Sequence, residues 1–501
     1  MAWSLALGCM AACVWGGEPL GLDVEASLTV TGELVAVTGP DAATVRRPAD
    51  MAARFEFQER GVGAEDPAGP AVERHYRRAE ATMRFGDATV KGELAPCARD
   101  VLVARRGTTP VPYLAEGFLT DEEYDLLDVP FDSLLIDDVL PGRRVTRGEA
   151  WTIPPDVAAG LLAIDTVESG GLEARLVDVA DGAAQVALSG IVDGAADGVP
   201  THVTVEATLR VPLAERSVPQ APDGKPVDEG SADDGASRTA AESPASADAV
   251  ADGVEASSDP SAAESYDLRG PVTDANAVII ERRQASHVAP GFDVEARVAV
   301  SRRPLAGGSD AAVAAPRSDA PPRPGKGMPG MVWHRDPAGR FELVRDARWR
   351  KVEDGESGLV MRLVDHGALV GQCSITALPI VEGATPPTRA EVERDWSRSL
   401  AGQVGRIDDA EEFTRGDGVR IVRIVSSGTA GRLPFRWMHY VLAAPGGRRA
   451  SVTFMLEDAS AQRFAAADRS LVDGLAFPQA TAGRGQAGTA SLPPAGGTRP
   501  R

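Results

Sequence analysis

Between residues 22 and 303, apolar and polar side chains alternate along one segment after another. A period of two is typical of strands that have one face against a core and the other in water. The pattern predicts one large antiparallel sheet, curved or bent into a half-barrel, with a few helices against one face. The strand-like runs are 22–37, 51–60, 75–85, 101–106, 172–179, 183–192, 201–213, 275–283 and 292–300.

Segments poor in large apolar side chains interrupt this pattern. Residues 217–264 hold eleven acidic residues against Lys225 and Arg238, so they carry −9 of the net charge of −21. Such a segment cannot offset its ordering entropy, and we expect it to be disordered. The strand-like runs on both sides of it indicate a long hairpin loop within one domain. Residues 304–331, rich in proline and glycine, are expected to be a linker, and residues 479–501 a disordered tail.

The chain starts with an uncharged apolar run at residues 2–15, AWSLALGCMAACVW. The run is shorter than the roughly 20 residues that span a bilayer. It fits the apolar part of a secretory signal, although the usual positive charge before it is missing. We therefore expect residues 1–21 to direct export to the periplasm or envelope. Cys13 follows two small residues, as in bacterial lipoprotein signals, and is a candidate for lipidation. The alternative is an ordinary apolar strand or helix, against which the polar sequence after Trp15 argues.

Cysteine and histidine usage gives no sign of a metal site. Without the export segment only Cys97 and Cys373 remain, which is too few for a disulfide scaffold, and both stand in apolar surroundings typical of buried free thiols. The six histidines stand singly, and no Cys/His spacing resembles a zinc site. We expect no bound metal and no cofactor.

Residues 332–478 form a second predicted domain with a different order of elements. Strands are followed by a helix over 389–404, which Thr388 caps, with an apolar face formed by Val392, Trp396, Leu400 and Val404. Three strands then follow, at 409–429, at 435–447 and from 448 to 458. A closing helix is predicted from about 460 to 472, with Gly474 after it.

This order resembles a known superfamily. The residues that carry the resemblance are Phe341 and Trp349, the inner strand 372–376 (QCSIT), the helix after Thr388 and the closing residues 475–477 (LAF). They are similar to the PsbP/DcrB-like superfamily, whose members are α/β/α sandwiches with an antiparallel sheet. The superfamily occurs in photosystem extrinsic subunits and bacterial envelope lipoproteins. The resemblance implies a largely non-enzymatic role. The first domain resembles lipoprotein-carrier-type curved β-sheet domains in its architecture alone, and the chain as a whole reads as α+β.

Composition excludes several classes of partner. Aromatic residues make up 5%, too few for a surface that stacks bases or sugars. A net charge of −21 and a pI near 4.8 disfavour binding to nucleic acid or to an anionic membrane surface. We expect no nucleic-acid partner, and membrane association only through the N-terminal signal or a lipid anchor.

Three groups of residues are candidates for chemistry. Acidic residues gather at Asp121, Glu122, Glu123, Asp125 and Asp128, where Thr120 and Glu123 predict a capping box. Acids in a first helical turn favour the helix dipole, and we interpret the group as a solvated helix start and not as a calcium loop.

The pair Asp365 and His366 stands on a predicted strand, so the two side chains are expected to point to opposite faces. No nucleophile elbow accompanies Ser374. We assign no catalytic residue. The third group, Arg436, Trp437, Tyr440 and Phe454, forms either core or the wall of a ligand groove.

Two functional hypotheses follow. The first is a non-catalytic envelope protein, a binding or docking module for an apolar ligand or for another envelope component. The second is a secreted hydrolase with a site formed where the two domains meet. A deep apolar pocket inside the first domain would favour carriage of an apolar ligand.

Overall fold

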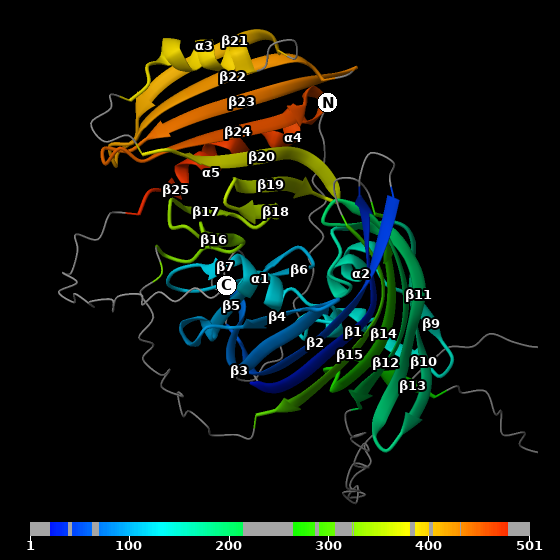
Figure 1. Ribbon diagram of the computed structural model, residues 1–501. Helices are drawn as coiled ribbons and strands as arrows, with labels where there is room; N and C mark the ends of the chain where they lie inside the picture. The colour runs from blue at the N-terminus through cyan, green and yellow to red at the C-terminus, as the bar shows by residue number, and fades with distance from the viewer. Residues whose placement is uncertain are drawn as a thin grey trace, which may run out of the picture.

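Antiparallel β-sheet with a few short helices makes up most of the computed structural model (Figure 1). The structure describes residues 21–38, 43–62, 70–213, 264–285, 290–305, 323, 325–380, 386–399, 404–430 and 432–478. Within these residues the sheets are open. None of the helices in the described part of the chain is long and apolar enough to cross a membrane. The export segment with Cys13, nearly all of the acidic insert and the C-terminal tail lie outside the described residues.

The first unit is built on a curved, open sheet of twelve strands. Its first and last long strands pair with each other, with Val24 opposite Arg302 and Leu28 opposite Val298. Alternate residues of these strands are buried, as the period of two predicts. In spatial order the strands are β6 (Thr109–Tyr113), β5 (Asp100–Arg106), β3 (Pro70–Phe85), β2 (Ala43–Gly61), β1 (Leu22–Thr38), β15 (Gly291–Pro304), β14 (Asp274–Arg283), β12 (Val199–Pro212), β11 (Ala183–Ala196), β10 (Thr166–Ala180) and β9 (Ala150–Thr152), and β4 (Ala88–Glu93) pairs with β3.

The strands on the two sides of the acidic insert are direct neighbours. β12 pairs with β14 from Thr201 opposite Arg283 to Arg210 opposite Asp274. The chain that returns from the insert forms β13 (Ser265–Asp267), which pairs with β8 (Arg144–Thr146). Leu268, just after β13, is fully buried in the core. The insert therefore leaves and re-enters the same sheet.

The concave side of the curved sheet is filled by the chain's own middle segment. This segment contains α1 (Asp121–Leu127), the 3-10 helix η2 (Ile136–Val139) and α2 (Pro155–Leu161). Phe131 and Leu135 from it belong to the same core as the sheet residues Val24 and Phe55. Figure 1 shows the curved sheet wrapped around α2. One continuous core thus forms, because the sheet buries its apolar face against these helices.

The second unit contains an open antiparallel sheet of seven strands with helices packed on both faces. Val392 and Trp396 of α3 (Arg389–Ser399) pack on one face. Phe464 from α4 (Ala461–Phe464) and Leu471 from α5 (Ala467–Asp473) pack on the other. The strand order is β18 (Trp349–Gly355), β19 (Gly358–Asp365), β20 (Ala368–Leu378), β24 (Arg449–Glu457), β23 (Leu433–Ala443), β22 (Arg420–Ala430) and β21 (Val404–Thr414).

Three boundaries in this unit differ from the sequence prediction. The helix after Thr388 ends at Ser399, and Val404 begins β21 instead of extending the helix; Leu400 lies outside the described residues. The predicted strand 409–429 is a hairpin of β21 and β22, because the chain turns at Gly418, whose φ of +83° suits glycine. The closing helix is interrupted at Ala465, whose φ of 46° is incompatible with a continuous helix.

A small third sheet joins the two units. β16 (Met331–Arg335) pairs in parallel with β7 (Leu119–Thr120) of the first unit, and β17 (Glu342–Asp346) and β25 (Leu475–Ala476) complete the sheet. The end of the expected linker is attached to the first unit as well. Arg323 binds the carboxylate of Glu123 with two hydrogen bonds of 2.5 and 2.6 Å. The last residues before the second unit therefore belong to the interface.

Candidate functional site

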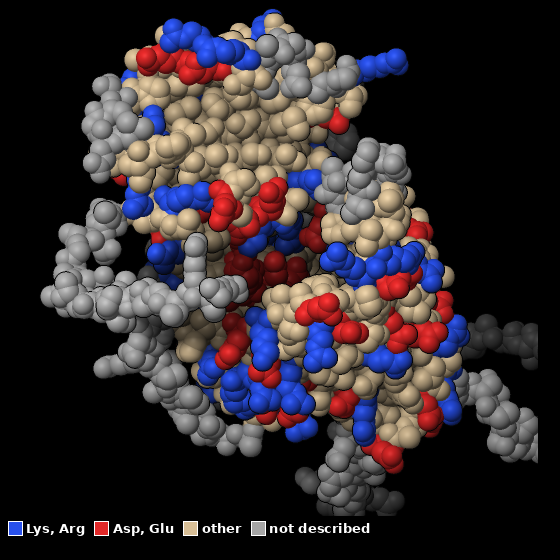
Figure 2. All heavy atoms as spheres, in the orientation of Figure 1, with Lys and Arg blue, Asp and Glu red and all other residues tan. Residues whose placement is uncertain are grey.

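A cleft of about 490 Å³ lies between the first unit and the strands β17 to β19 of the second. Figure 2 shows a hollow between the two parts, with acidic side chains at its floor. Acids, arginines and one histidine line the cleft, together with about as many apolar residues. The polar and charged lining residues are Arg74, Arg106, Thr109, Tyr124, Asp128, Asp132, Asp165, Asp346, Arg348, Arg350, Asp365 and His366.

Helix α1 forms one wall of this region and fastens the two units together. The capping box predicted from sequence is present: the Glu123 amide donates to Thr120 Oγ1 at 3.2 Å, and the Thr120 amide donates to Glu123 Oε2 at 2.9 Å. Asp121 is buried and accepts a hydrogen bond from Arg345 of β17. Glu122 accepts one of 2.8 Å from Lys351 of β18. The expected solvated helix start is therefore an intramolecular interface, with Asp121 and Glu123 buried.

Arg350 of β18 is shared by three carboxylates of the first unit. It lies 3.2 Å from Asp197, 3.9 Å from Asp125 and 4.0 Å from Asp128. Asp128 lines the cleft, whereas Asp125 does not; their side chains keep 42% and 71% of their accessible surface, and packed protein atoms nearby reduce their hydration. This desolvation, aided by neighbouring acids and opposed by Arg350, raises the pKa of each to about 6. The cluster has more negative charges than arginine can balance.

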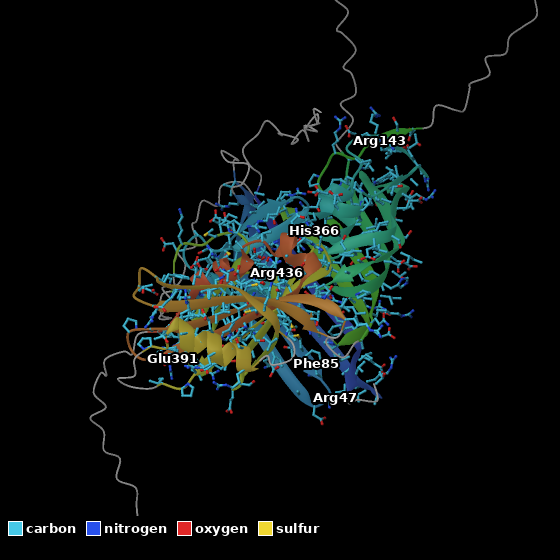
Figure 3. All side chains as sticks on the ribbon, turned by 90° about the horizontal axis from the view of Figure 1, so that it is seen from above. Arg47, Phe85, Arg143, His366, Glu391 and Arg436 are labelled. Atoms are coloured by element: carbon cyan, nitrogen blue, oxygen red, sulfur yellow. The ribbon has the colours of Figure 1, made fainter. Side chains whose placement is uncertain are left out.

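The pair Asp365 and His366 is placed at the mouth of the cleft, but the two side chains have different environments. Asp365 ends β19 and accepts hydrogen bonds of 3.2 Å from both Arg348 and Arg463. These contacts lower its pKa despite partial burial. His366 stands in the following turn with a φ of 45°. In Figure 3 His366 lies where the strands of the two units meet.

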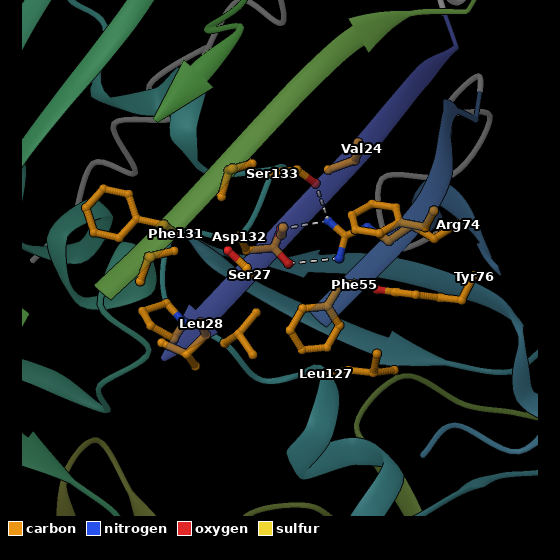
Figure 4. A pocket seen from close by; sticks show the side chains of 16 residues that line it. Val24, Ser27, Leu28, Phe55, Arg74, Tyr76, Leu127, Phe131, Asp132 and Ser133 are labelled. Atoms are coloured by element: carbon orange, nitrogen blue, oxygen red, sulfur yellow. Dashed lines mark hydrogen bonds and ion pairs between the residues drawn. The ribbon is translucent and has the colours of Figure 1, made fainter. Parts of the chain in front are cut away.

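The described interior of the first unit holds a small cavity of about 30 Å³ (Figure 4). Apolar side chains such as Phe55 and Leu28 line it, next to the buried ion pair of Arg74 and Asp132. A cavity of this size has space for about one water molecule. This cavity is not the deep apolar pocket that would favour an apolar ligand.

The four residues proposed as a ligand groove do not line one surface. Trp437 is buried on the face covered by α3, whereas Tyr440 and Phe454 are buried in the core on the opposite face. Arg436 is half-buried near the start of β23 and forms a 2.7 Å ion pair with Asp458. Residues 437 and 440 are an odd number apart on one strand, which places them on opposite faces. The structure therefore places the three aromatic residues in two separate cores.

The two described cysteines also differ from each other. Cys373 is fully buried in β20, and burial raises the pKa of its thiol well above the usual value. Cys97 is exposed in a short 3-10 helix, so the expectation that it is buried is wrong. Pro96 precedes it and ends the strand pattern that suggested burial. No group of three or more His, Cys, Asp or Glu side chains suited to a metal occurs among the described residues.

The sequence identified the acids of α1 but not the cleft. Arg348 and Arg350 lie far along the chain from Asp125 and Asp128, so no local pattern in the sequence predicts that these residues meet. One feature of the sequence could have indicated this contact: the basic residues Arg348, Arg350 and Lys351 form a cluster that is opposite in charge to the acidic cluster on α1. Complementary clusters indicate that two segments can meet, but they do not show that a cleft remains between them.

Comparisons with known proteins give only distant similarities. No protein-family model and no curated protein matches the chain. Among solved structures, the chain is similar to cyanobacterial PsbP (CyanoP) from Synechocystis sp. PCC 6803, at 14% identity over 32% of this chain and 100% of that one, with a TM-score of 0.25.

It is also similar to a lipovitellin studied for lipid–protein interactions, at 7% identity and a TM-score of 0.27, over 58% of this chain and 26% of that one. A BenF-like porin from Pseudomonas fluorescens Pf-5 matches at 7% identity over 87% of this chain and 97% of that one, with a TM-score of 0.11. Scores this low establish no common fold.

Proposed function

We propose that this protein is a non-catalytic, exported envelope protein that binds a polar partner in the cleft between its two units. The observation that carries the proposal is the contrast between two spaces. The cleft of about 490 Å³ is lined by charged side chains, while the interior of the curved sheet offers about 30 Å³. A cleft with charged groups in its walls suits a polar ligand or a protein segment, whereas a cavity with space for about one water molecule is too small for an acyl chain.

The charge distribution supports a partner with polar groups over an apolar ligand. Arg348 is balanced by Asp346 and Asp365, but Arg350 faces Asp125, Asp128 and Asp197 together. An apolar ligand would remove water from these charges without giving them partners, and this desolvation costs free energy. Of the two ligand classes expected from the sequence, an envelope partner is the one that the cleft favours.

We also propose fold relationships for the two units. The second unit is an α/β/α sandwich of the PsbP/DcrB-like type, which the placement of α3 on one face and of α4 and α5 on the other supports. The first unit is a curved sheet of the lipoprotein-carrier type whose concave side is occupied by its own segment. Its open sheet supports this assignment, and the filled interior argues against carriage of lipid in this state.

Export and lipidation remain proposals that concern residues outside the described part of the chain. We propose that residues 1–21 direct export and that Cys13 carries the lipid. Intact mass of the protein purified from the producing cells tests both. Cleavage just before Cys13 with an added diacylglyceryl and acyl mass would support lipidation. Cleavage elsewhere would support export alone, and a full-length protein with Met1 in the cytoplasm would contradict both.

Site-specific photocrosslinking in native cells tests the cleft. A photoreactive amino acid replaces Thr109, an exposed residue that lines the cleft, and in a matched variant it replaces Thr29, an exposed strand residue on the other face of the curved sheet. We expect one protein partner to crosslink from position 109 and not from position 29. Equal crosslinking at both positions, or none at 109, would contradict the proposal. Stoichiometric lipid in an extract of the purified protein would favour the apolar ligand instead.

The alternative function is a secreted hydrolase that uses the same cleft. The observation in its favour is that Asp128, with a pKa of about 6, and His366 line one cavity, where a carboxyl group could act as a general acid. Against it, the described lining residues include no serine or cysteine. Hydrolysis of ester, phosphate or glycoside probes that is abolished in both Asp128→Asn and His366→Ala would establish the hydrolase and overturn the binding protein.

A further inference from the structure

Arg362 has no charged partner in the structure, although part of it is buried. It lies on β19, on the face of the second sheet opposite the buried residues Met361 and Leu363. Its Nε is fully buried and has no hydrogen-bond partner. Among the described residues Arg362 forms no ion pair. By contrast, the more deeply buried Arg74 and Arg345 each contact a carboxylate.

The strand register shows which side chains surround Arg362. Arg350 lies directly opposite it on β18, and Gln372 lies directly opposite on β20. Ser374 is two residues farther along β20 and therefore shares the same face. Gln372 and Ser374 are half-buried like Arg362, and neither side chain forms a hydrogen bond within the described residues. Three neighbouring polar side chains thus leave their hydrogen-bonding capacity unused by the described protein.

The environment of Arg362 is unfavourable for a cation. Two arginines directly opposite each other on neighbouring strands repel each other. Arg350 directs its charge to the carboxylates of the cleft, so it is balanced, but Arg362 is not. Burial without a compensating acid lowers the pKa of the Arg362 guanidinium from its usual value. Half-buried polar groups without partners in a folded protein call for water, an ion or a ligand to satisfy them.

We propose that Arg362, Gln372 and Ser374 form a binding site for an oxyanion, that is, for a carboxylate or a phosphate group. The planar guanidinium can donate two parallel hydrogen bonds to such a group, and the amide nitrogen of Gln372 and the hydroxyl of Ser374 supply further donors. This site lies beside the cleft, with Arg350 between the two, and it is independent of the function proposed for the cleft.

The borders of the site limit the size of its ligand. Val360 lies opposite Ser374, and Met455 lies opposite Gln372 on β24, so apolar side chains flank the donors. On β24, Thr453 lies opposite Ser374 and forms a hydrogen bond with His439 of β23, on which Trp396 of α3 is stacked with ring centroids 4.2 Å apart. Helix α3 therefore closes one side of this face. An anionic group attached to a small apolar body fits these borders.

Titration of the full-length protein with two anions tests the site. Sodium phosphate and sodium acetate are added separately, with sodium chloride keeping the ionic strength constant so that general screening does not change. The readout is the arginine Nε–H resonance of Arg362 in the labelled protein, assigned by its absence from Arg362→Gln. We expect this resonance to shift in a saturable way with at least one of the anions. Saturation by phosphate indicates a phosphate-bearing ligand, and saturation by acetate alone indicates a carboxylate.

Variants decide whether the binding belongs to this site. Affinity, measured calorimetrically, is expected to fall by about ten- to a hundredfold in Arg362→Gln, as the loss of charge-assisted hydrogen bonds implies. Arg362→Lys is expected to weaken binding as well, because an ammonium lacks the planar fork. The control is Arg54→Gln, an exposed strand arginine of the first unit, and it should leave affinity unchanged. No saturable shift with either anion, or equal affinity in wild type and Arg362→Gln, would overturn the proposal.

Discussion

Arg74 and Asp132 form a two-pronged ion pair inside the first unit, with N–O distances of 2.8 and 2.6 Å. Arg74 belongs to β3, and Asp132 belongs to the segment that fills the concave face, so the pair joins the sheet to its filling. Glu59 of β2 accepts a further 2.8 Å hydrogen bond from Arg74 Nε. All three side chains are buried. The contacts with Arg74 lower the pKa of Asp132 even though burial opposes this.

The first prediction concerns this pair. Asp132→Asn removes a charge and leaves Arg74 buried with less compensation, so we expect the free energy of unfolding to fall by about 3–5 kcal/mol. Urea unfolding followed by fluorescence measures the change. The matched control is Asp23→Asn, which breaks the 2.6 Å pair of Asp23 with Arg77 at the surface and should cost about 1 kcal/mol or less. If both variants lose the same free energy of unfolding, burial of the Arg74–Asp132 pair does not make it more important for stability than the surface pair.

The second prediction is a dependence of stability on pH that comes from the cleft. The pKa values of Asp125 and Asp128 are raised from 3.8 to about 6 in the folded protein. A carboxyl group whose pKa is higher in the folded than in the unfolded protein stabilises the fold when it is protonated. This contribution is fully present below the pKa of the unfolded protein and is lost as the pH rises through about 6. Replacing both by Asn removes this loss. The stability of the variant relative to that of wild type should therefore be higher at pH 7.5 than at pH 4.5.

Thermal unfolding at the two pH values measures this difference. Asp178→Asn, in an exposed pair with Arg147, serves as the control and should show no such pH-dependent difference. If the Asp125 and Asp128 variant changes stability by the same amount at both pH values, the two carboxyl groups do not titrate between them.

The third prediction concerns the acidic insert. Because residues 217–264 lie outside the paired strands β12, β13 and β14, they can be replaced by a short turn without separating paired strands. We expect the melting temperature to stay nearly unchanged and the pI to rise. Deletion of 275–300 removes β14 and most of β15, and should cost more than the ~5–15 kcal/mol that a domain can lose. A melting curve of each variant provides the test. Unfolding of the shortened variant would show that the insert contributes to the fold.

The fourth prediction concerns how α5 is held on the second sheet. The hydroxyl of Tyr440 donates to Asp468 Oδ2 at 2.6 Å and accepts from Arg423 Nε at 2.7 Å. Tyr440→Phe leaves the buried carboxylate of Asp468 short of a donor, so we expect a loss of about 1–3 kcal/mol in the free energy of unfolding. Tyr266→Phe removes an exposed hydroxyl that donates to Glu264 and should change stability by about 0.5 kcal/mol or less. Similar effects in both variants would contradict the role of the buried network.

Prediction from sequence was most successful where a property depends on neighbours in the chain. Alternation of apolar and polar residues predicted the mostly antiparallel strands, and the Thr120–Glu123 spacing predicted the capping box of α1. It failed where a short-range signal was ambiguous. The sequence predicts a helix that continues to Val404, because the apolar residue at every fourth position includes Val404, which is the first residue of the following strand. The closing helix is interrupted at Ala465, which the sequence does not predict, because alanine favours helices.

The sequence by itself therefore determined the local elements of this protein, its acidity and the two-sided character of its strands, because these follow from backbone periodicity and side-chain polarity. Only the tertiary structure decided that Arg350 meets Asp125 and Asp128, that Trp437 and Tyr440 belong to different cores, and that Arg362 has no partner within the described residues. These relationships join segments far apart in the chain. Contacts of that kind are selected by the packing of whole sheets, and no single segment of the sequence contains the information that specifies them.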